Sequence, residues 1–172
     1  MNNPITYIDL DGVLADFRGW ILSLDKGAYE IAEKHPSYIL ELMVFNYKQC
    51  FLHCGVITKN MHILDDANAQ GPKRILTVIP VKAIVSYFYK NAPSDDGYSW
   101  NINKCFDIIR KLKRNKISWC KEHLGISEEN ILFCNTRTEK LIYAVNNAVL
   151  YDDCEETVQK WEHEGCKAFL IK

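Results

Sequence analysis

The sequence predicts an α/β fold in which helices cover both faces of a parallel β-sheet. Short apolar runs rich in β-branched residues alternate along the chain with longer segments of helical periodicity, an order typical of parallel strands joined by helical crossovers. The 172 residues are 48% hydrophobic and 25% charged, with a formal net charge of −1. This composition favours one globular domain and excludes a disordered, collagen-like or low-complexity chain.

The first strand is predicted at residues 5–10, an apolar run that leads into the acidic turn Asp9-Leu10-Asp11-Gly12. Apolar residues then recur at helical spacing over residues 15–49, with breaks at Gly27 and at His35-Pro36. This pattern predicts two or three short helices, which would form a small cap inserted after the first strand.

A polar segment at residues 60–72 ends in a Gly-Pro pair and precedes a second buried strand at residues 74–79. We therefore expect the α/β core at 1–17 and 72–172, and the helical cap at 18–71.

The rest of the chain continues the alternation of helices and strands. A loop at residues 91–98, which contains Pro93, lengthens the crossover that leads to the third strand. Helices are predicted at residues 81–90, 101–124 and 155–164, and strands at 131–134, 149–151 and 168–171.

Two carboxylates, Asp9 and Asp11, lie just past the first strand, and Gly12 lets the backbone turn sharply beneath them. One carboxylate can attack phosphorus while its neighbour handles the proton, but two clustered acids repel an anionic substrate unless a divalent cation intervenes. The pattern therefore implies magnesium. An EF-hand calcium loop is excluded, because Val13 and Leu14 stand where that loop needs an oxygen ligand and a glycine.

The segment from Asp9 to Phe17, Asp-Leu-Asp-Gly-Val-Leu-Ala-Asp-Phe, resembles the first motif of the haloacid dehalogenase (HAD) superfamily. Later motifs of that family follow in order: a threonine in the second strand, a lysine before the fourth strand and an acidic pair at its end. The matching residues are Thr77, Lys140 and Asp152-Asp153. The resemblance implies a Rossmann-like, HAD-like sheet with a cap.

Within the superfamily, Leu-Thr-x-Ile-Pro around Thr77 and the spacing Lys116-x-x-Trp119 are most similar to the 5'(3')-deoxyribonucleotidase group and its phage and bacterial relatives. This similarity implies a hydrolase of phosphate monoesters, a 5'-nucleotidase-like phosphatase acting on nucleoside or deoxynucleoside 5'-monophosphates through an aspartyl-phosphate intermediate. In that group a short link joins the threonine to the lysine, so residues 81–115 are an insertion that could reshape the rim of the site.

The resemblance also implies a role for each matched residue. Asp9 would be the nucleophile, Asp11 the general acid and base, Thr77 a hydrogen-bond donor to a phosphoryl oxygen, and Lys140 the group that neutralises developing charge. The residues that would hold Mg²⁺ are Asp9, Asp11, Asp152 and Asp153. Those that would contact substrate are Phe17, Thr77 and Lys116.

Several of these residues have alternatives. Thr58 also lies in a strand-like setting. Lys116 competes with Lys140 for the phosphate; we favour Lys140 for catalysis and expect Lys116 to contact either the phosphate or the residues around it. Phe17 can stack on a nucleobase or belong to the core. A second group, Cys50, His53, Cys54 and His62, is a candidate zinc cluster, although a Cys-rich helix packed in the cap explains it as well.

The expected partner is a small phosphorylated substrate. The near-neutral charge gives no broad basic footprint for nucleic acid, and the local run from Lys111 to Lys116 reads as a solvated helix face. No apolar stretch is long enough to span a membrane, and seven scattered cysteines suit reduced thiols, so we expect a cytoplasmic protein, with a homodimer left open. The alternatives are a noncatalytic binding protein, or a phosphatase of nucleic-acid ends or sugar phosphates.

Overall fold

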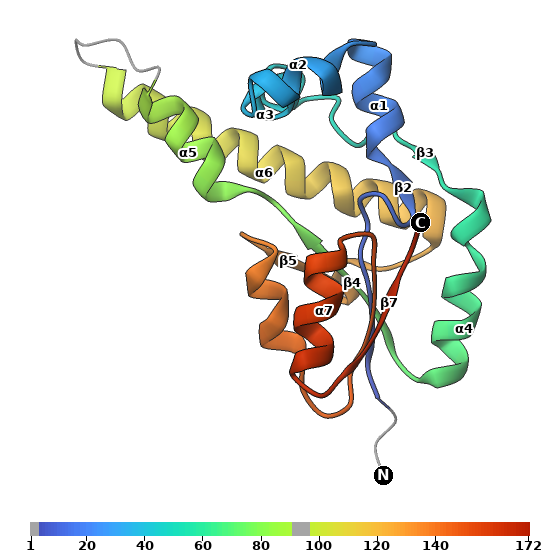
Figure 1. Ribbon diagram of the computed structural model, residues 1–172. Helices are drawn as coiled ribbons and strands as arrows, with labels where there is room; N and C mark the ends of the chain where they lie inside the picture. The colour runs from blue at the N-terminus through green and yellow to red at the C-terminus, as the bar shows by residue number, and fades with distance from the viewer. Residues whose placement is uncertain (1–3, 91–96) are drawn as a thin grey trace.

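The computed structural model describes residues 4–90 and 97–172, with the side chains of 67–70 and 97–101 left aside. Its centre is a five-stranded sheet with the strand order β5-β4-β1-β6-β7 (Figure 1), and every neighbouring pair in it is parallel. The predicted α/β class with a parallel sheet is confirmed. The strands are β1 (Thr6–Ile8), β4 (Lys73–Val78), β5 (Ile131–Cys134), β6 (Val149–Asp152) and β7 (Lys167–Leu170).

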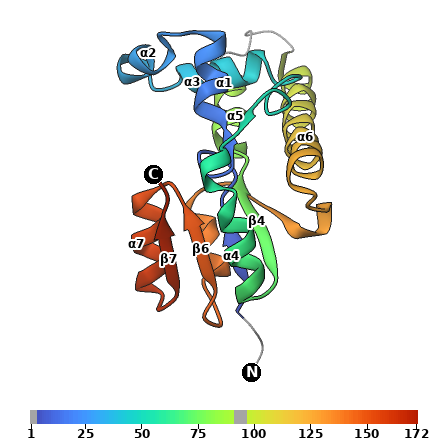
Figure 2. The same cartoon turned by 90° about the vertical axis from the view of Figure 1, so that its right-hand side faces the viewer.

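Helices cover both faces of this sheet. Successive side chains of a strand point to opposite faces, so each face carries apolar side chains that a helix can bury. Tyr7 and Leu150 pack with Trp161 of α7 (Glu155–His163), beside the 3₁₀ helix η3 (Thr138–Tyr143). Ile8 and Tyr151 belong to the opposite cluster, which includes side chains of α4 (His62–Gln70) and α6 (Gly97–Leu124). Figure 2 shows α7 on one side of the strands and α6 on the other.

The cap contains three short helices, α1 (Phe17–Leu24), α2 (Ala28–Lys34) and α3 (Tyr38–Phe45), with breaks where Gly27 and His35-Pro36 predicted them. Asp16 caps α1, since its Oδ1 accepts a hydrogen bond from the Gly19 N–H at 2.7 Å. The strands β2 (Ala15–Asp16) and β3 (Gly55–Val56), which flank these three helices in the sequence, form an antiparallel pair. The sequence did not predict this pair, because two residues are too few for a periodic pattern.

Two parts of the predicted layout differ from the structure. The polar segment at 60–72 contains the short 3₁₀ helix η1 (Thr58–Asn60) in part and then all of α4, which contacts β4 of the sheet. α4 lies beside the sheet (Figure 2), although the sequence placed it in the cap. The predicted end of the cap at residue 71 stays a prediction.

The insertion forms a helical hairpin of α5 (Val81–Lys90) and α6 that reaches toward α3 of the cap. The predicted range of α5 is confirmed. The predicted end of the loop at residue 98 is two residues too late, because α6 begins at Gly97. Residues 91–96 of this loop lie outside the described part of the chain. A further 3₁₀ helix, η2 (Glu128–Asn130), leads into β5.

All seven cysteines are free thiols, as predicted. Within residues 4–90 and 97–172, the proposed zinc cluster of Cys50, His53, Cys54 and His62 does not come together, and residues 46–53 form successive turns rather than a Cys-rich helix. None of the helices described is both long and apolar enough to cross a membrane.

Candidate active site

Three neighbouring strands bring polar side chains to one edge of the sheet. β1 lies between β4 and β6, so Asp9 directly after β1, Thr77 near the end of β4 and Asp152 at the end of β6 meet at their carboxyl ends. Ligands of open α/β sheets bind at this edge. The alternative Thr58 begins η1 in another part of the chain and does not line the cavity described below.

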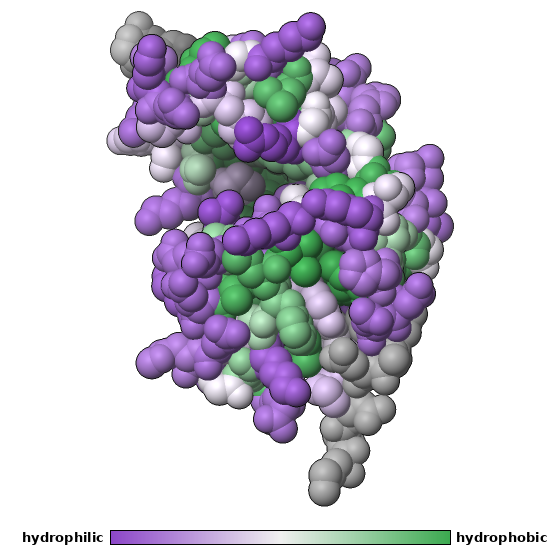
Figure 3. Space-filling view, turned by 45° about the vertical axis from the view of Figure 1, so that its right-hand side comes forward, coloured by the Kyte–Doolittle hydropathy of each residue, from purple (hydrophilic) through white to green (hydrophobic). Residues whose placement is uncertain are grey.

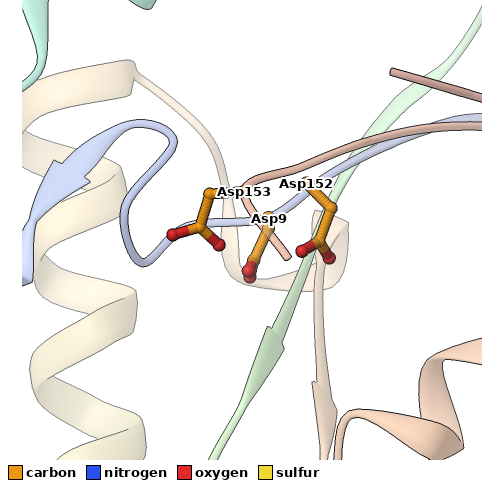
Figure 4. Close-up of side chains that lie close together, drawn as sticks. All are labelled: Asp9, Asp152 and Asp153. Atoms are coloured by element: carbon orange, nitrogen blue, oxygen red, sulfur yellow. The ribbon is translucent and has the colours of Figure 1, made fainter. Parts of the chain in front are cut away.

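Asp9, Asp152 and Asp153 form a carboxylate cluster in which each residue offers one oxygen, all within 4.8 Å of one another. Figure 4 shows the three carboxylates converging. Asp9 and Asp152 are buried, and Asp153 lies at the exposed side. Burial and the neighbouring charges of Asp9 and Asp152 raise the pKa of Asp153 to about 6. Like charges held this close favour a bound cation.

Lys140 compensates two of these carboxylates. Its side chain is 1% exposed, and its Nζ lies 2.9 Å from Asp9 Oδ2 and 2.7 Å from Asp152 Oδ2. Burial alone would lower the pKa of Lys140, but Asp9 and Asp152 outweigh this effect and raise it above its ordinary value. The ammonium group therefore stays charged beside Asp9 and Asp152.

Lys116 forms a second buried cluster with Asp11 and Thr77. Its Nζ donates hydrogen bonds to Asp11 Oδ2 at 2.6 Å, to Thr77 Oγ1 at 2.6 Å and to the Val78 carbonyl at 2.9 Å. A lysine ammonium has three N–H bonds, so all of them are used within the protein. This geometry fits a role in holding Asp11 better than direct contact with a phosphate.

Asp11 has the character of an acid that can carry a proton. Burial raises its pKa, and this effect exceeds the lowering by Lys116. Its Oδ1 atom is buried and has no hydrogen-bond partner among the described residues, so one oxygen remains available for a ligand. Buried polar atoms are rarely left unsatisfied, and this atom marks a place where a bound group would fit.

Gly12 allows the two clusters to lie so close together. Its φ is +82°, and a Cβ atom added there would lie 2.1 Å from Asp153 Oδ2. Both the left-handed backbone and the contact require glycine. The turn after Asp11 is therefore the surface against which Asp153 packs.

A cavity of about 910 Å³ lies against these clusters, and Asp9, Asp11, Lys116, Lys140 and Asp153 line it. Apolar side chains of the cap, among them Ile39, Met43 and Phe51, form part of the same wall together with Phe17 at the start of α1. In Figure 3 a hollow opens between the cap and the sheet, with hydrophobic side chains inside it and hydrophilic ones around it. Thr77 and Asp152 lie behind this wall and support it.

Phe51 is a cavity residue that the sequence analysis missed. Its φ of +71° is unusual for a bulky residue, and its ring stacks on Phe17 with centroids 5.2 Å apart and lies 4.3 Å from Lys116 Nζ. The Lys-x-x-Trp helix maintains this conformation: Trp119 Nε1 donates to the Cys54 carbonyl, and Asn115 Nδ2 donates to the Cys50 carbonyl.

The donor set of the site fits a divalent cation. Asp9, Asp11, Asp152 and Asp153 provide four carboxylates against the two ammonium groups of Lys116 and Lys140, a formal surplus of two negative charges. Hard cations such as Mg²⁺ prefer oxygen ligands of this kind. Asp9 and Asp153 reach the cavity directly, and the free Asp11 oxygen lies on the same side chain as the Lys116 contact.

Comparison with known proteins gives little guidance. No family model and no curated protein matches the sequence. One solved structure, a hydrolase from Streptococcus pneumoniae TIGR4, aligns over 100% of this chain and 94% of its own, with 14% sequence identity and a TM-score of 0.45. A similarity this low does not bear on the activity of this chain, which has to be inferred from its own side chains.

Proposed function

We propose that the protein is a magnesium-dependent phosphatase of small phosphate monoesters, with nucleoside or deoxynucleoside 5'-monophosphates as the expected substrates. One observation carries the proposal: two carboxylates, Asp9 and Asp11, line one cavity, and each is paired with its own buried lysine. Lys140 places a positive charge beside Asp9, while burial raises the pKa of Asp11, as a nucleophile and a general acid require.

The reaction would proceed in two steps. A carboxylate oxygen of Asp9 attacks phosphorus, the ester P–O bond breaks, and protonated Asp11 gives its proton to the leaving oxygen. Asp11 then accepts a proton from water, which attacks the aspartyl phosphate and releases inorganic phosphate. Lys140 contributes positive charge beside the reacting centre, and Thr77 supports Asp11 and Lys116 from behind.

Magnesium would be held by the carboxylates of Asp9 and Asp153 and the backbone carbonyl of Asp11, with Asp152 beside them, so that the Asp11 carboxyl group stays available as the general acid. When bound, it supplies charge neutralisation that allows an anionic phosphate to approach a cluster of carboxylates. The three converging carboxylates of Asp9, Asp152 and Asp153 support this assignment.

Two features support catalysis over the alternatives. The inserted helix α5 lines the cavity with Lys82, Ala83 and Ser86 rather than filling it, so a noncatalytic role that depends on an occluded crevice is not favoured. Of the four basic residues in the run at 111–116, only Lys116 lines the cavity, and its side chain is buried in the site. A nucleic-acid end would need more of that run to face the cavity.

The test measures phosphate release from a panel of ribo- and deoxyribonucleoside monophosphates and sugar phosphates, in magnesium or in EDTA. We expect turnover only with magnesium, and a loss of at least about a thousandfold in Asp9→Asn. Asp107→Asn is a matched control, because that carboxylate is exposed on α6 and pairs only with Arg110 among the described residues. Absence of turnover on every substrate, in folded protein that binds magnesium, would overturn the proposal.

A further inference from the structure

Three cations line the cavity outside the two buried clusters. Arg18 comes from α1, Lys82 from α5 and Arg137 from the residue before η3, and all three side chains are exposed. Among the described residues that line the cavity, the only acids are Asp9, Asp11 and Asp153. The mouth of the cavity is therefore positive although the whole chain carries a formal net charge of −1.

These rim cations differ from the two buried lysines in what surrounds them. Lys116 has three oxygen acceptors and Lys140 is paired with two carboxylates. Across the described ranges, Arg18, Lys82 and Arg137 form no ion pair with a carboxylate. Arg137 lies close enough to Asp153 to lower the pKa of that carboxyl group, but without a paired carboxylate the three cations can still attract an anion that enters the cavity.

Arg18 stacks on an aromatic ring of the cavity wall. Its guanidinium carbon lies 4.4 Å from the centroid of the Tyr29 ring, and Tyr29 also lines the cavity. Stacking on an aromatic face restricts the guanidinium plane while its N–H edge stays free. An edge of this kind binds a phosphate through two parallel hydrogen bonds.

The cavity is also larger than one phosphate group needs. Its volume of about 910 Å³ is in the upper part of the ~300–1,000 Å³ range of small-molecule sites. The wall formed by Ile39, Leu40 and Met43 is apolar, so the body of the ligand would present an apolar or planar face to the cap.

From these observations we infer that the preferred substrate carries a second phosphate group, bound by Arg18, Lys82 and Arg137, in addition to the phosphate at Asp9. A nucleoside bisphosphate has both a planar face and a second phosphate. Its base can lie against the apolar wall while one phosphate lies at Asp9 and the other contacts Arg18, Lys82 and Arg137. This inference rests on the proposed function for the phosphate at Asp9, but the binding of the second phosphate can be measured without turnover.

The experiment measures binding by calorimetry, in magnesium, of adenosine 5'-monophosphate, adenosine 3',5'-bisphosphate and a 5'-phosphorylated dinucleotide to the full chain. The variants are wild type, Asp9→Asn and the triple variant Arg18→Gln, Lys82→Gln, Arg137→Gln. A triple control removes the same charge from exposed lysines that do not line the cavity: Lys34→Gln, Lys121→Gln, Lys167→Gln.

We expect the bisphosphate to bind wild type and Asp9→Asn at least about tenfold more tightly than the monophosphate, and the triple rim variant to lose this preference. The control should keep it. Equal affinities in wild type, or a preference that survives in the rim variant, would overturn the inference. A 5'-phosphorylated dinucleotide that binds more tightly than the bisphosphate would also overturn it, in favour of a nucleic-acid end. Because Asp9→Asn reports binding without turnover, a lack of phosphate release would count against the proposed function alone.

Discussion

The two buried lysines of the site have similar exposure but different surroundings. Lys140 lies between Asp9 and Asp152, with Asp153 close by, whereas Lys116 meets one carboxylate, one hydroxyl and one carbonyl. The Lys140 cluster keeps a surplus of negative charge, and the Lys116 cluster is balanced. The difference indicates that the first cluster is built for a cation and an incoming phosphate, and the second for control of one acid.

Removing Lys140 should cause the largest loss of both stability and turnover. In Lys140→Met the side chain keeps its length, but Asp9 and Asp152 remain buried without their cation. We expect a loss of about 3–5 kcal/mol in the free energy of unfolding in EDTA at pH 7.5, the usual cost of an uncompensated buried charge, and at least a hundredfold loss of turnover. Urea unfolding and phosphate release measure the two effects.

The matched control is Lys160→Met. Lys160 pairs with Glu156 on the surface of α7, with both side chains largely exposed, so its removal should cost less than about 1 kcal/mol. If both variants unfold at the same urea concentration, the Lys140 pairs do not stabilise the fold and the contrast between the two clusters fails.

Removing Lys116 should change protonation more than binding. Lys116 lowers the pKa of Asp11, so in Lys116→Met that pKa rises further and Asp11 stays protonated to higher pH. The basic limb of the pH profile of kcat/KM should therefore move to higher pH. We also expect kcat to fall about tenfold because Asp11 is less well positioned, while KM changes less than threefold.

The resemblance at the sequence level implied instead that Lys116 contacts substrate. That assignment predicts the opposite split, with a raised KM, an unchanged kcat and an unmoved basic limb. Lys121→Met, an exposed lysine on the same helix, controls for the loss of charge from α6.

Elements with a local sequence pattern could be predicted, whereas an element that depends on tertiary contact could not. β5 and α5 occupy the predicted ranges, because a short apolar run or a periodic helix is a local property of the chain. α4 was not predicted, because its sequence, His-Ile-Leu-Asp-Asp-Ala-Asn-Ala-Gln, is largely polar and its position depends on contact with β4.

Within the site, the motif residues could be predicted one by one, but their pairing could not. Sequence spacing does not show that Lys116 pairs with Asp11 and Lys140 with Asp9. Lys116 and Asp11, for example, are 105 residues apart in the chain. Phe51 was missed because its exceptional backbone depends on hydrogen bonds from α6, and Arg18, Lys82 and Arg137 were missed because three distant segments supply them.

A smaller effect is expected at the helix that supports Phe51. Trp119 is buried and donates through Nε1 to the Cys54 carbonyl at 2.9 Å. Trp119→Phe keeps an aromatic ring but leaves that carbonyl without its donor, so we expect a loss of about 1–2 kcal/mol in the free energy of unfolding. The pH profile should stay unchanged, because Lys116 keeps its three acceptors. A shift in the profile like that of Lys116→Met would show that the two halves of the motif act as one unit.

The smallest effect concerns the exposed member of the carboxylate cluster. The pKa of Asp153 is about 6, above the ordinary value of about 3.9 for aspartate, so between about pH 4 and 6 the folded state binds a proton that the unfolded state releases. Stability in EDTA should therefore fall as the pH rises through this window, by about 1 kcal/mol or less because solvent screens this side chain.

Asp153→Asn should remove this fall and be slightly more stable than wild type at pH 7.5 in EDTA, with no gain at pH 4. Magnesium should reverse the order at pH 7.5, because only the ionised carboxylate offers both oxygens to the ion. Thermal unfolding at pH 4, 5, 6 and 7.5, with magnesium or EDTA, measures both signs. If magnesium stabilises wild type and Asp153→Asn equally, Asp153 does not face the ion, and the negative surplus around Lys140 has to be assigned to Asp9 and Asp152 alone.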